Sequence, residues 1–291
     1  MLVRRAHAKL NLHLRVGPLQ RDGFHPLHSW MVTVSLHDTL RFADADRLSL
    51  RCSDPTLPTD GRNLVIVAAE KLREHVRRPT LGADIELGKR IPSGGGLAGG
   101  SSDAASTLLT LNELWSLKLE RAELCRVAAS VGSDVPFFLF APSADCRGRG
   151  DLVTPLPPPR PRAAVLLLPG TSMPTPAVYR RFDELCGQSA SPTDTPARFE
   201  EWTHLDAFAL LPRLRNDLEP AAFHLDPSLR RLRDDAEQLL GRAVRMSGSG
   251  STLFTLFDTF DDARLAADTI ASRLGILSRA VQLATIPSDG R

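Results

Sequence analysis

Glycines crowd one short segment of the chain, at positions 94, 95, 96, 99 and 100. The segment follows residues 83–91, where an alternating strand pattern ends at a proline, and precedes an apolar helix predicted from about Ser101 to Leu114. Glycine lets a backbone adopt positive φ angles and approach a ligand closely. The helix would point its free N–H groups and the positive end of its dipole at the loop. We therefore expect a phosphate-binding loop, with a flexible linker as the alternative interpretation. Its expected binding residues are Pro92, Gly94, Gly95, Gly96, Leu97, Ala98, Gly99, Gly100, Ser101 and Ser102.

Two well-known phosphate loops do not fit this segment. Gly94, Gly96 and Gly99 have the spacing of a dinucleotide fingerprint, but that fold needs a following strand that ends in an acidic residue. Residues 120–129 look like a helix instead. A Walker A loop needs a lysine directly after its last glycine, and here a serine follows Gly100. A cation for the phosphates must come from elsewhere in the chain.

Residues 8–16 predict the first strand, because apolar side chains alternate there with polar ones. Lys9 and Asn11 share the polar face of this strand. The chain uses arginine for almost all of its basic charge, so each of its four lysines is of interest. A solvated strand residue is the plain alternative for Lys9. We expect Lys9 and the arginines to be the available donors to a bound phosphate.

The order of expected elements predicts an α+β protein of two domains. The proline-rich stretch 154–162 cannot form a regular helix or a central strand, so we expect a boundary there, between residues 1–153 and 154–291. Beyond it the pattern reads strand, helix, strand, strand, helix, strand, with a loop at 187–200. This order predicts a ferredoxin-like layer that covers the substrate cleft. The helices expected in the whole chain lie at 63–76, 101–114, 121–131, 226–241 and 261–274.

Charge and cysteine content exclude several classes of protein. The formal net charge is only +2, which gives no field that would favour nucleic acid or an acidic membrane surface. No stretch approaches the roughly 20 apolar residues that cross a membrane, and the N-terminus does not resemble a signal peptide. Four cysteines without metal-type spacing predict reduced thiols in a cytoplasmic protein. The eight histidines lack metal spacing as well, so we expect no metal-ligating cluster.

Three segments resemble the kinase superfamily named for galactokinase, homoserine kinase, mevalonate kinase and phosphomevalonate kinase. They are residues 8–12 (AKLNL), 91–105 (IPSGGGLAGGSSDAA) and 245–251 (RMSGSGS). Within it the chain resembles the 4-diphosphocytidyl-2-C-methyl-D-erythritol kinase family, through further matches in family order at residues 21–25, 62–64, 132–138, 174–176 and 216–220. The chain departs from the family pattern at four positions, with His7 for proline, Phe24 for tyrosine, Ala98 for glycine and Asp103 for asparagine.

The resemblance implies an enzyme that moves the γ-phosphate of ATP onto the 2-hydroxyl of 4-diphosphocytidyl-2-C-methyl-D-erythritol, in the methylerythritol phosphate route to isoprenoids, with Mg²⁺ on the phosphates. It implies that Asp134 accepts the hydroxyl proton and that Lys9 beside it helps to hold the attacking oxygen. The local sequence alone would favour a capping role for Asp134. Asn11 faces the same way as Lys9 and is placed to hydrogen-bond the substrate.

The resemblance also implies a pocket for cytidine. Phe24 and Tyr179 would supply two stacking faces, and His25 would read the edge of the base. Ordinary core packing is the alternative for both aromatic rings. Asn63 matches a nucleotide-side position, although helix capping explains it equally well.

The loop of Ser247, Gly248 and Ser249 would close over phosphates from the second domain, with a plain β-hairpin turn as its alternative. Rival functions are a superfamily kinase for homoserine or a mevalonate intermediate, a non-catalytic nucleotide-binding protein, and a nicotinamide dehydrogenase. The two stacking rings favour a small-molecule substrate that carries cytidine diphosphate. The presence of both Lys9 and Asp134 argues for catalysis. We expect a monomer or homodimer.

Overall fold

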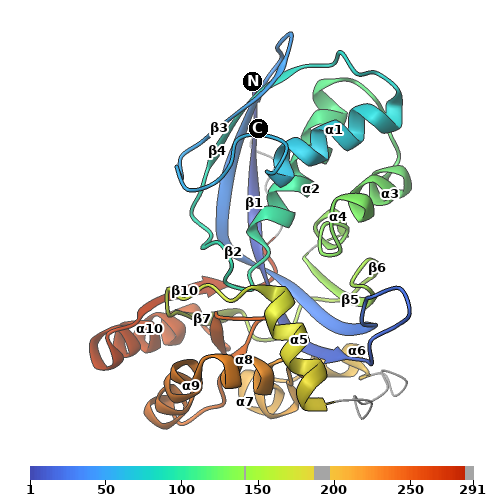
Figure 1. Ribbon diagram of the computed structural model, residues 1–291. Coiled ribbons are helices and arrows are strands. Elements are labelled where there is room, and N and C mark those ends of the chain that lie inside the picture. The colour runs from blue at the N-terminus through green and yellow to red at the C-terminus, as the bar shows by residue number, and fades with distance from the viewer. Residues whose placement is uncertain (141, 187–196, 286–291) are drawn as a thin grey trace.

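The computed structural model describes residues 1–140, 142–186 and 197–285. The first half of the chain is built on a sheet with the strand order β3-β4-β2-β5-β6, in which β1 pairs with β2. Its strands are β1 (Leu2–Val16), β2 (Leu27–Ala43), β3 (Leu48–Cys52), β4 (Ala83–Gly88), β5 (Ser143–Gly148) and β6 (Leu152–Pro155). Helices α1 to α4 lie along one side of this sheet (Figure 1). They are α1 (Leu64–Val76), α2 (Gly99–Leu114), α3 (Arg121–Val131) and α4 (Phe137–Phe140).

The core of this half lies between the sheet and its helices. Phe42 and Ile85 of the sheet pack in one cluster with Leu72 of α1, Leu108 of α2 and Phe137 of α4. Each of these side chains is fully buried, and burial of a residue of this size contributes about 1.5–3 kcal/mol. This packing fixes α2, and therefore the loop that precedes it, against the sheet.

The second half contains an antiparallel sheet with the order β10-β7-β9-β8. Counted along this half, these are its fourth, first, third and second strands, so the ferredoxin-like prediction is confirmed. The strands are β7 (Ala163–Leu168), β8 (Arg245–Met246), β9 (Leu253–Phe257) and β10 (Leu277–Gln282). The helices are α5 (Thr175–Cys186), α6 (Phe199–Trp202), α7 (Ala207–Leu210), the 3-10 helix Leu211–Arg213, α8 (Glu219–Leu225), α9 (Pro227–Leu240) and α10 (Phe260–Leu274).

Strand β7 shows how the two halves are joined. Val165 and Leu167 pack with the helices of the second half, whereas Leu166 packs with Leu10 and Leu12 of β1. The strand is therefore buried on both faces, which explains its unbroken apolar sequence. Because the apolar residues of β1 turn toward the second sheet, the side chains between them face the opposite way.

Several boundaries differ from those expected. Helix α2 begins at Gly99, two residues before the predicted start. Strand β6 runs across the expected domain boundary at 153/154, as an edge strand that tolerates Pro155, so that boundary remains a prediction. Residues 187–196 of the expected loop lie outside the described part, but residues 199–200 are helical, so the loop prediction is wrong there.

In the described residues, no helix is long and apolar enough to span a membrane.

Candidate active site

The glycine-rich segment forms the connection from β4 to α2, and two of its glycines have conformations that suit glycine. Gly94 has a φ of +69° and Gly96 a φ of +76°. A Cβ on Gly96 would lie 2.2 Å from the carbonyl oxygen of Ser247, so a side chain cannot fit there. Ala98 adopts the left-handed region with a φ of 53°, which costs a residue with a Cβ about 1 kcal/mol. The segment thus keeps its loop shape even where alanine replaces the usual glycine.

The loop between β8 and β9 packs against this glycine-rich segment. The Ser247 hydroxyl donates to the carbonyl of Gly96 at 3.0 Å and accepts from the backbone N–H of Asn11 at 3.2 Å. The N–H of Thr252 donates to the carbonyl of Gly95 at 3.2 Å. The three segments that carry the superfamily resemblance therefore meet at one place.

Asn216 holds the β8–β9 loop, a role that was not predicted from the sequence. Its Nδ2 donates to the carbonyl of Met246 at 2.8 Å and to that of Gly248 at 2.7 Å. Glu219 accepts from the N–H of Met246 at 2.8 Å. The segment 216–220 was recognised as a family match, but nothing in its local pattern indicates a contact with residues 30 positions away.

Lys9 and Asp134 form an ion pair, with Nζ 3.5 Å from Oδ2. Lys9 also donates to Oδ1 of Asn11, and to the carbonyl oxygen of Gly96 at 3.3 Å. The Lys9 side chain is 4% exposed and that of Asp134 is 29% exposed. The ammonium is therefore fixed and shielded, whereas the carboxylate remains accessible. A carboxylate in this position can accept a proton from a bound hydroxyl.

One cavity of about 1070 Å³ collects most of the residues predicted from the sequence. Those that line it are Lys9, Asn11, Phe24, His25, Asn63, Pro92, Gly94, Gly95, Gly96, Ala98, Gly99, Gly100, Ser101, Asp134, Tyr179, Gly248 and Ser249. Within the described ranges, three predicted residues are absent from its wall. Leu97 is buried and accepts from the N–H of Lys9 at 3.1 Å, Ser102 is buried in α2, and Ser247 bonds the glycine loop as above.

The aromatic end of the cavity contains Phe24, His25 and Tyr179. Phe24 is 46% exposed, which does not fit the core-packing alternative. His25 donates from Nδ1 to the carbonyl of Gly17 at 2.9 Å, and its ring centroid lies 5.2 Å from that of Tyr179. Burial and the nearby Asp134 charge raise the pKa of the Tyr179 phenol above its ordinary value. Tyr179 therefore presents a neutral ring to the cavity.

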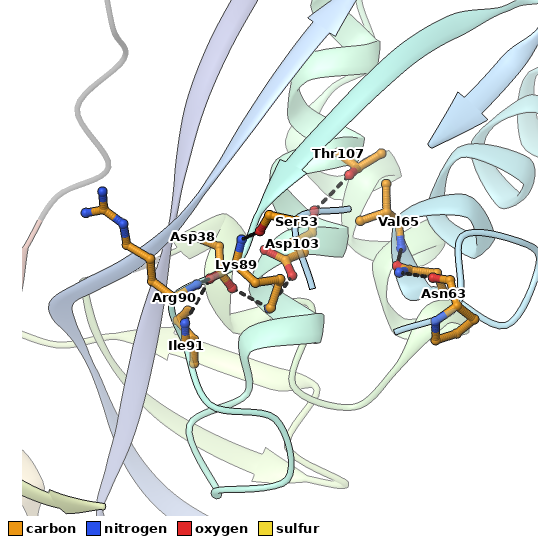
Figure 2. Close-up of polar contacts among 10 residues, drawn as sticks. Asp38, Ser53, Asn63, Val65, Lys89, Arg90, Ile91, Asp103 and Thr107 are labelled. Atoms are coloured by element: carbon orange, nitrogen blue, oxygen red, sulfur yellow. Dashed lines mark hydrogen bonds and ion pairs between the residues drawn. The ribbon is translucent and has the colours of Figure 1, made fainter. Parts of the chain in front are cut away.

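Asn63 caps helix α1, as Figure 2 shows, and it also lines the cavity. Its Oδ1 accepts from the N–H of Val65 at 3.0 Å, and its Nδ2 donates to the carbonyl of Pro58 at 2.7 Å. The capping alternative is therefore correct. The nucleotide-side role remains a prediction that the position allows.

A buried charged cluster beside the glycine loop was not predicted from the sequence (Figure 2). Lys89 bonds Oδ2 of Asp38 and lies 2.9 Å from Oδ2 of Asp103, and all three side chains are almost completely buried. Burial, with the adjacent Asp38 charge, raises the pKa of Asp103 to about 7 despite the opposing effect of Lys89. Asp38 also accepts from the N–H of Ile91 at 2.9 Å, so the cluster anchors the start of the loop. Lys89 lies 51 residues from Asp38 and 14 residues from Asp103, so a local sequence pattern cannot indicate this cluster.

Comparisons with known proteins agree with this geometry. Residues 63–141 match the GHMP kinases N terminal domain, and residues 200–276 match the GHMP kinases C terminal domain. A 4-diphosphocytidyl-2-C-methyl-D-erythritol kinase of Synechococcus sp. (strain CC9605) is 40% identical, over 100% of this chain and 98% of that protein.

Solved structures give the same result. A crystal structure of 4-(cytidine 5'-diphospho)-2C-methyl-D-erythritol kinase is 37% identical with a TM-score of 0.77, over 98% of this chain and 100% of that one. A homoserine kinase from Cytophaga hutchinsonii has a TM-score of 0.73 at 19% identity, over 99% of this chain and 96% of that one, and so shares the fold. The protein described here belongs to the GHMP kinases and, among them, to the 4-diphosphocytidyl-2-C-methyl-D-erythritol kinase family.

Proposed function

We propose that this protein transfers the γ-phosphate of ATP to the 2-hydroxyl of 4-diphosphocytidyl-2-C-methyl-D-erythritol. The observation that carries this proposal is the position of the Lys9–Asp134 pair. Both residues line a cavity that contains the glycine loop and the aromatic residues Phe24 and Tyr179. A phosphate donor at the loop and a cytidine at the aromatic residues would bring the transferred group and the acceptor alcohol together at this pair.

In the proposed reaction, Asp134 accepts the proton of the substrate hydroxyl as its oxygen attacks the γ-phosphorus. The bond between the γ-phosphorus and the bridging oxygen breaks, and ADP leaves. Lys9 holds the attacking oxygen with its ammonium, while Asn11 and Gly96 keep that ammonium in place. Positioning and charge stabilisation therefore supply most of the catalysis, as is usual for phosphoryl transfer.

The glycine loop supports ATP as the donor. Gly99, Gly100 and Ser101 form the first turn of α2 and line the cavity, so the start of this helix faces the proposed phosphates. Mg²⁺ would neutralise the charge that develops on the β- and γ-phosphates. Ser101 lines the cavity at the start of α2 and carries a hydroxyl oxygen, the ligand type that Mg²⁺ prefers, so it would hold the ion together with phosphate oxygens.

We also propose that the protein works in the cytoplasm. Cys52, Cys125 and Cys146 are free thiols, which suits a reducing compartment.

Release of ADP tests the proposed reaction. The protein should release ADP from ATP and Mg²⁺ when 4-diphosphocytidyl-2-C-methyl-D-erythritol is added, and should not respond to homoserine or mevalonate. ADP release with one of these two alcohols instead would keep the phosphotransfer and overturn the cytidine assignment. Folded protein that binds ATP but responds to none of the three would favour a non-catalytic nucleotide-binding role.

A further inference from the structure

Arg149 lies on the turn between β5 and β6, next to the segment that carries Asp134. The turn is shaped by Gly148 and Gly150, whose φ angles are +68° and +104°. A Cβ on Gly150 would lie 3.6 Å from Oδ1 of Asp134 and 3.6 Å from the carbonyl oxygen of Ser133. The backbone beside Arg149 therefore packs directly against the proposed catalytic carboxylate.

The Arg149 side chain reaches from this turn to the aromatic end of the cavity. Its guanidinium carbon lies 3.8 Å from the centroid of the Phe24 ring. Its Nη2 donates to Oδ2 of Asp22 at 2.8 Å, and Oδ1 of Asp22 accepts from the N–H of Phe24 at 3.1 Å. One face of the Phe24 ring is covered by the guanidinium, which leaves the opposite face for a base.

The other cations of the cavity wall have different positions or partners. Lys89 is held between two buried carboxylates, and Arg62 is paired with Asp60 at 2.8 Å, next to the helix cap Asn63. Lys9 is bound to Asp134. The remaining cation among the described wall residues besides Arg149 is Arg180, an exposed residue of α5.

A substrate that links cytidine to an alcohol has its diphosphate between these two ends. If the base lies at Phe24 and the alcohol at Asp134, the diphosphate lies between these two ends of the cavity. It must then pass the residue that contacts both ends. Arg149 is that residue, because the adjoining Gly150 packs against the Asp134 segment and the Arg149 side chain covers Phe24. In the described chain, Asp22 occupies Nη2, whereas Nε and Nη1 make no hydrogen bond. A charge-assisted hydrogen bond from either of these N–H groups can hold a phosphate oxygen.

We propose that Arg149 binds the diphosphate of the substrate and thereby selects a diphosphate-linked alcohol over a free one. This inference rests on the proposed function, since it takes the base and the alcohol to be at the two ends named above. Asp22 then acts as a positioning residue, which holds the guanidinium beside the Phe24 ring. The contact would contribute to substrate affinity and leave the chemistry to Lys9 and Asp134.

Calorimetric titration with CDP and with cytidine separates this role from simple support of the Phe24 ring. Both ligands are added to protein saturated with a non-hydrolysable ATP analogue, so that CDP does not report on the ATP end. Arg149→Ala should weaken CDP binding by about 10- to 100-fold, the usual size of a lost charge-assisted contact. Cytidine affinity should stay unchanged, and Arg149→Lys should retain part of the CDP affinity through its point charge.

Arg147→Ala is the matched control, because Arg147 is a neighbouring arginine that pairs with Asp145 and lies outside the described cavity wall. It should bind CDP as the wild type does. Equal losses for CDP and cytidine in Arg149→Ala, or no loss at all, would overturn the diphosphate contact and leave the proposed function intact. Wild-type protein that binds neither CDP nor cytidine would instead overturn the proposed function, and this inference with it.

Discussion

The Lys9 ammonium lies 3.5 Å from Oδ2 of Asp134 and is itself held by Asn11 and by the glycine loop. Lys9 comes from a buried strand, whereas Asp134 follows helix α3 and is accessible from the cavity. The pair therefore combines a cation that cannot move far with a carboxylate that a ligand can reach. Preorganised charge of this kind stabilises a transition state without reorganisation during the reaction.

Lys9→Ala should lower kcat by about 10²- to 10³-fold, because it removes the preorganised charge at the attacking oxygen. Lys71→Ala is the matched control, since Lys71 is an exposed lysine of α1 that pairs with Glu74. Steady-state rates should be measured beside thermal unfolding. A loss of rate that merely follows a loss of folded protein would remove Lys9 from the mechanism.

Tyr179→Ala should raise KM for the cytidyl substrate by about tenfold, the size of one lost base-stacking contact, and leave KM for ATP nearly unchanged. Tyr179→Phe should behave like the wild type, because it keeps the ring. The two Michaelis constants are measured for each variant. An equal rise in both constants would contradict a stacking role at the substrate end.

Gly96→Ala should disturb the contact between the glycine loop and the β8–β9 loop. Its new Cβ would lie 2.2 Å from the carbonyl oxygen of Ser247, in addition to the strain of a φ of +76°. Gly170→Ala controls for the strain alone, since Gly170 has a φ of +77° and no neighbouring atom within 4 Å of a Cβ. The control should lose about 1 kcal/mol of unfolding free energy, and Gly96→Ala should lose more. Equal losses of unfolding free energy for the two variants in chemical denaturation would show that the close approach to Ser247 does not destabilise the protein further.

Asp103→Asn should change how stability depends on pH. Burial beside Asp38 raises the pKa of Asp103 from 3.8 to about 7, so the folded state binds a proton that the unfolded state releases in this range. This contribution is complete below pH 3.8 and is lost as pH rises to about 7. The unfolding free energy of the wild type should therefore fall, relative to the variant, by up to about 1.4 kcal/mol per pH unit. Parallel pH profiles of the two proteins would contradict the raised pKa.

Local patterns predicted the elements that are determined by local sequence. Asp226 caps α9 and Gly241 ends it in the left-handed region, as expected for a capping aspartate and a terminal glycine. Helix α5 was missed, although Pro176 stands near its start, because the prolines around Thr175 suggest a loop. The short strand β3 was missed as well, since its pairing with β4 is a tertiary property.

The candidate site also combines residues that local sequence can indicate with residues whose roles depend on tertiary contacts. Lys9 could be placed on the polar face of β1 from alternation alone, and the structure brings it to the cavity. Asp38, Lys89 and Asn216 could not be identified in this way, because each takes its role from a partner distant in sequence. Ser102 shows the reverse case. It follows the glycines as a phosphate-binding serine would, yet the helical turn directs it into the interior.

The most direct test of the account is transfer of labelled γ-phosphate from ATP to 4-diphosphocytidyl-2-C-methyl-D-erythritol by the wild type and by Asp134→Asn. The substitution keeps the size of the side chain and removes the base. The account predicts a labelled product with the wild type, a rate about 10²- to 10⁴-fold lower with the variant, and unchanged ATP binding by both. Near-normal transfer by folded Asp134→Asn would contradict the assignment of Asp134 as the base.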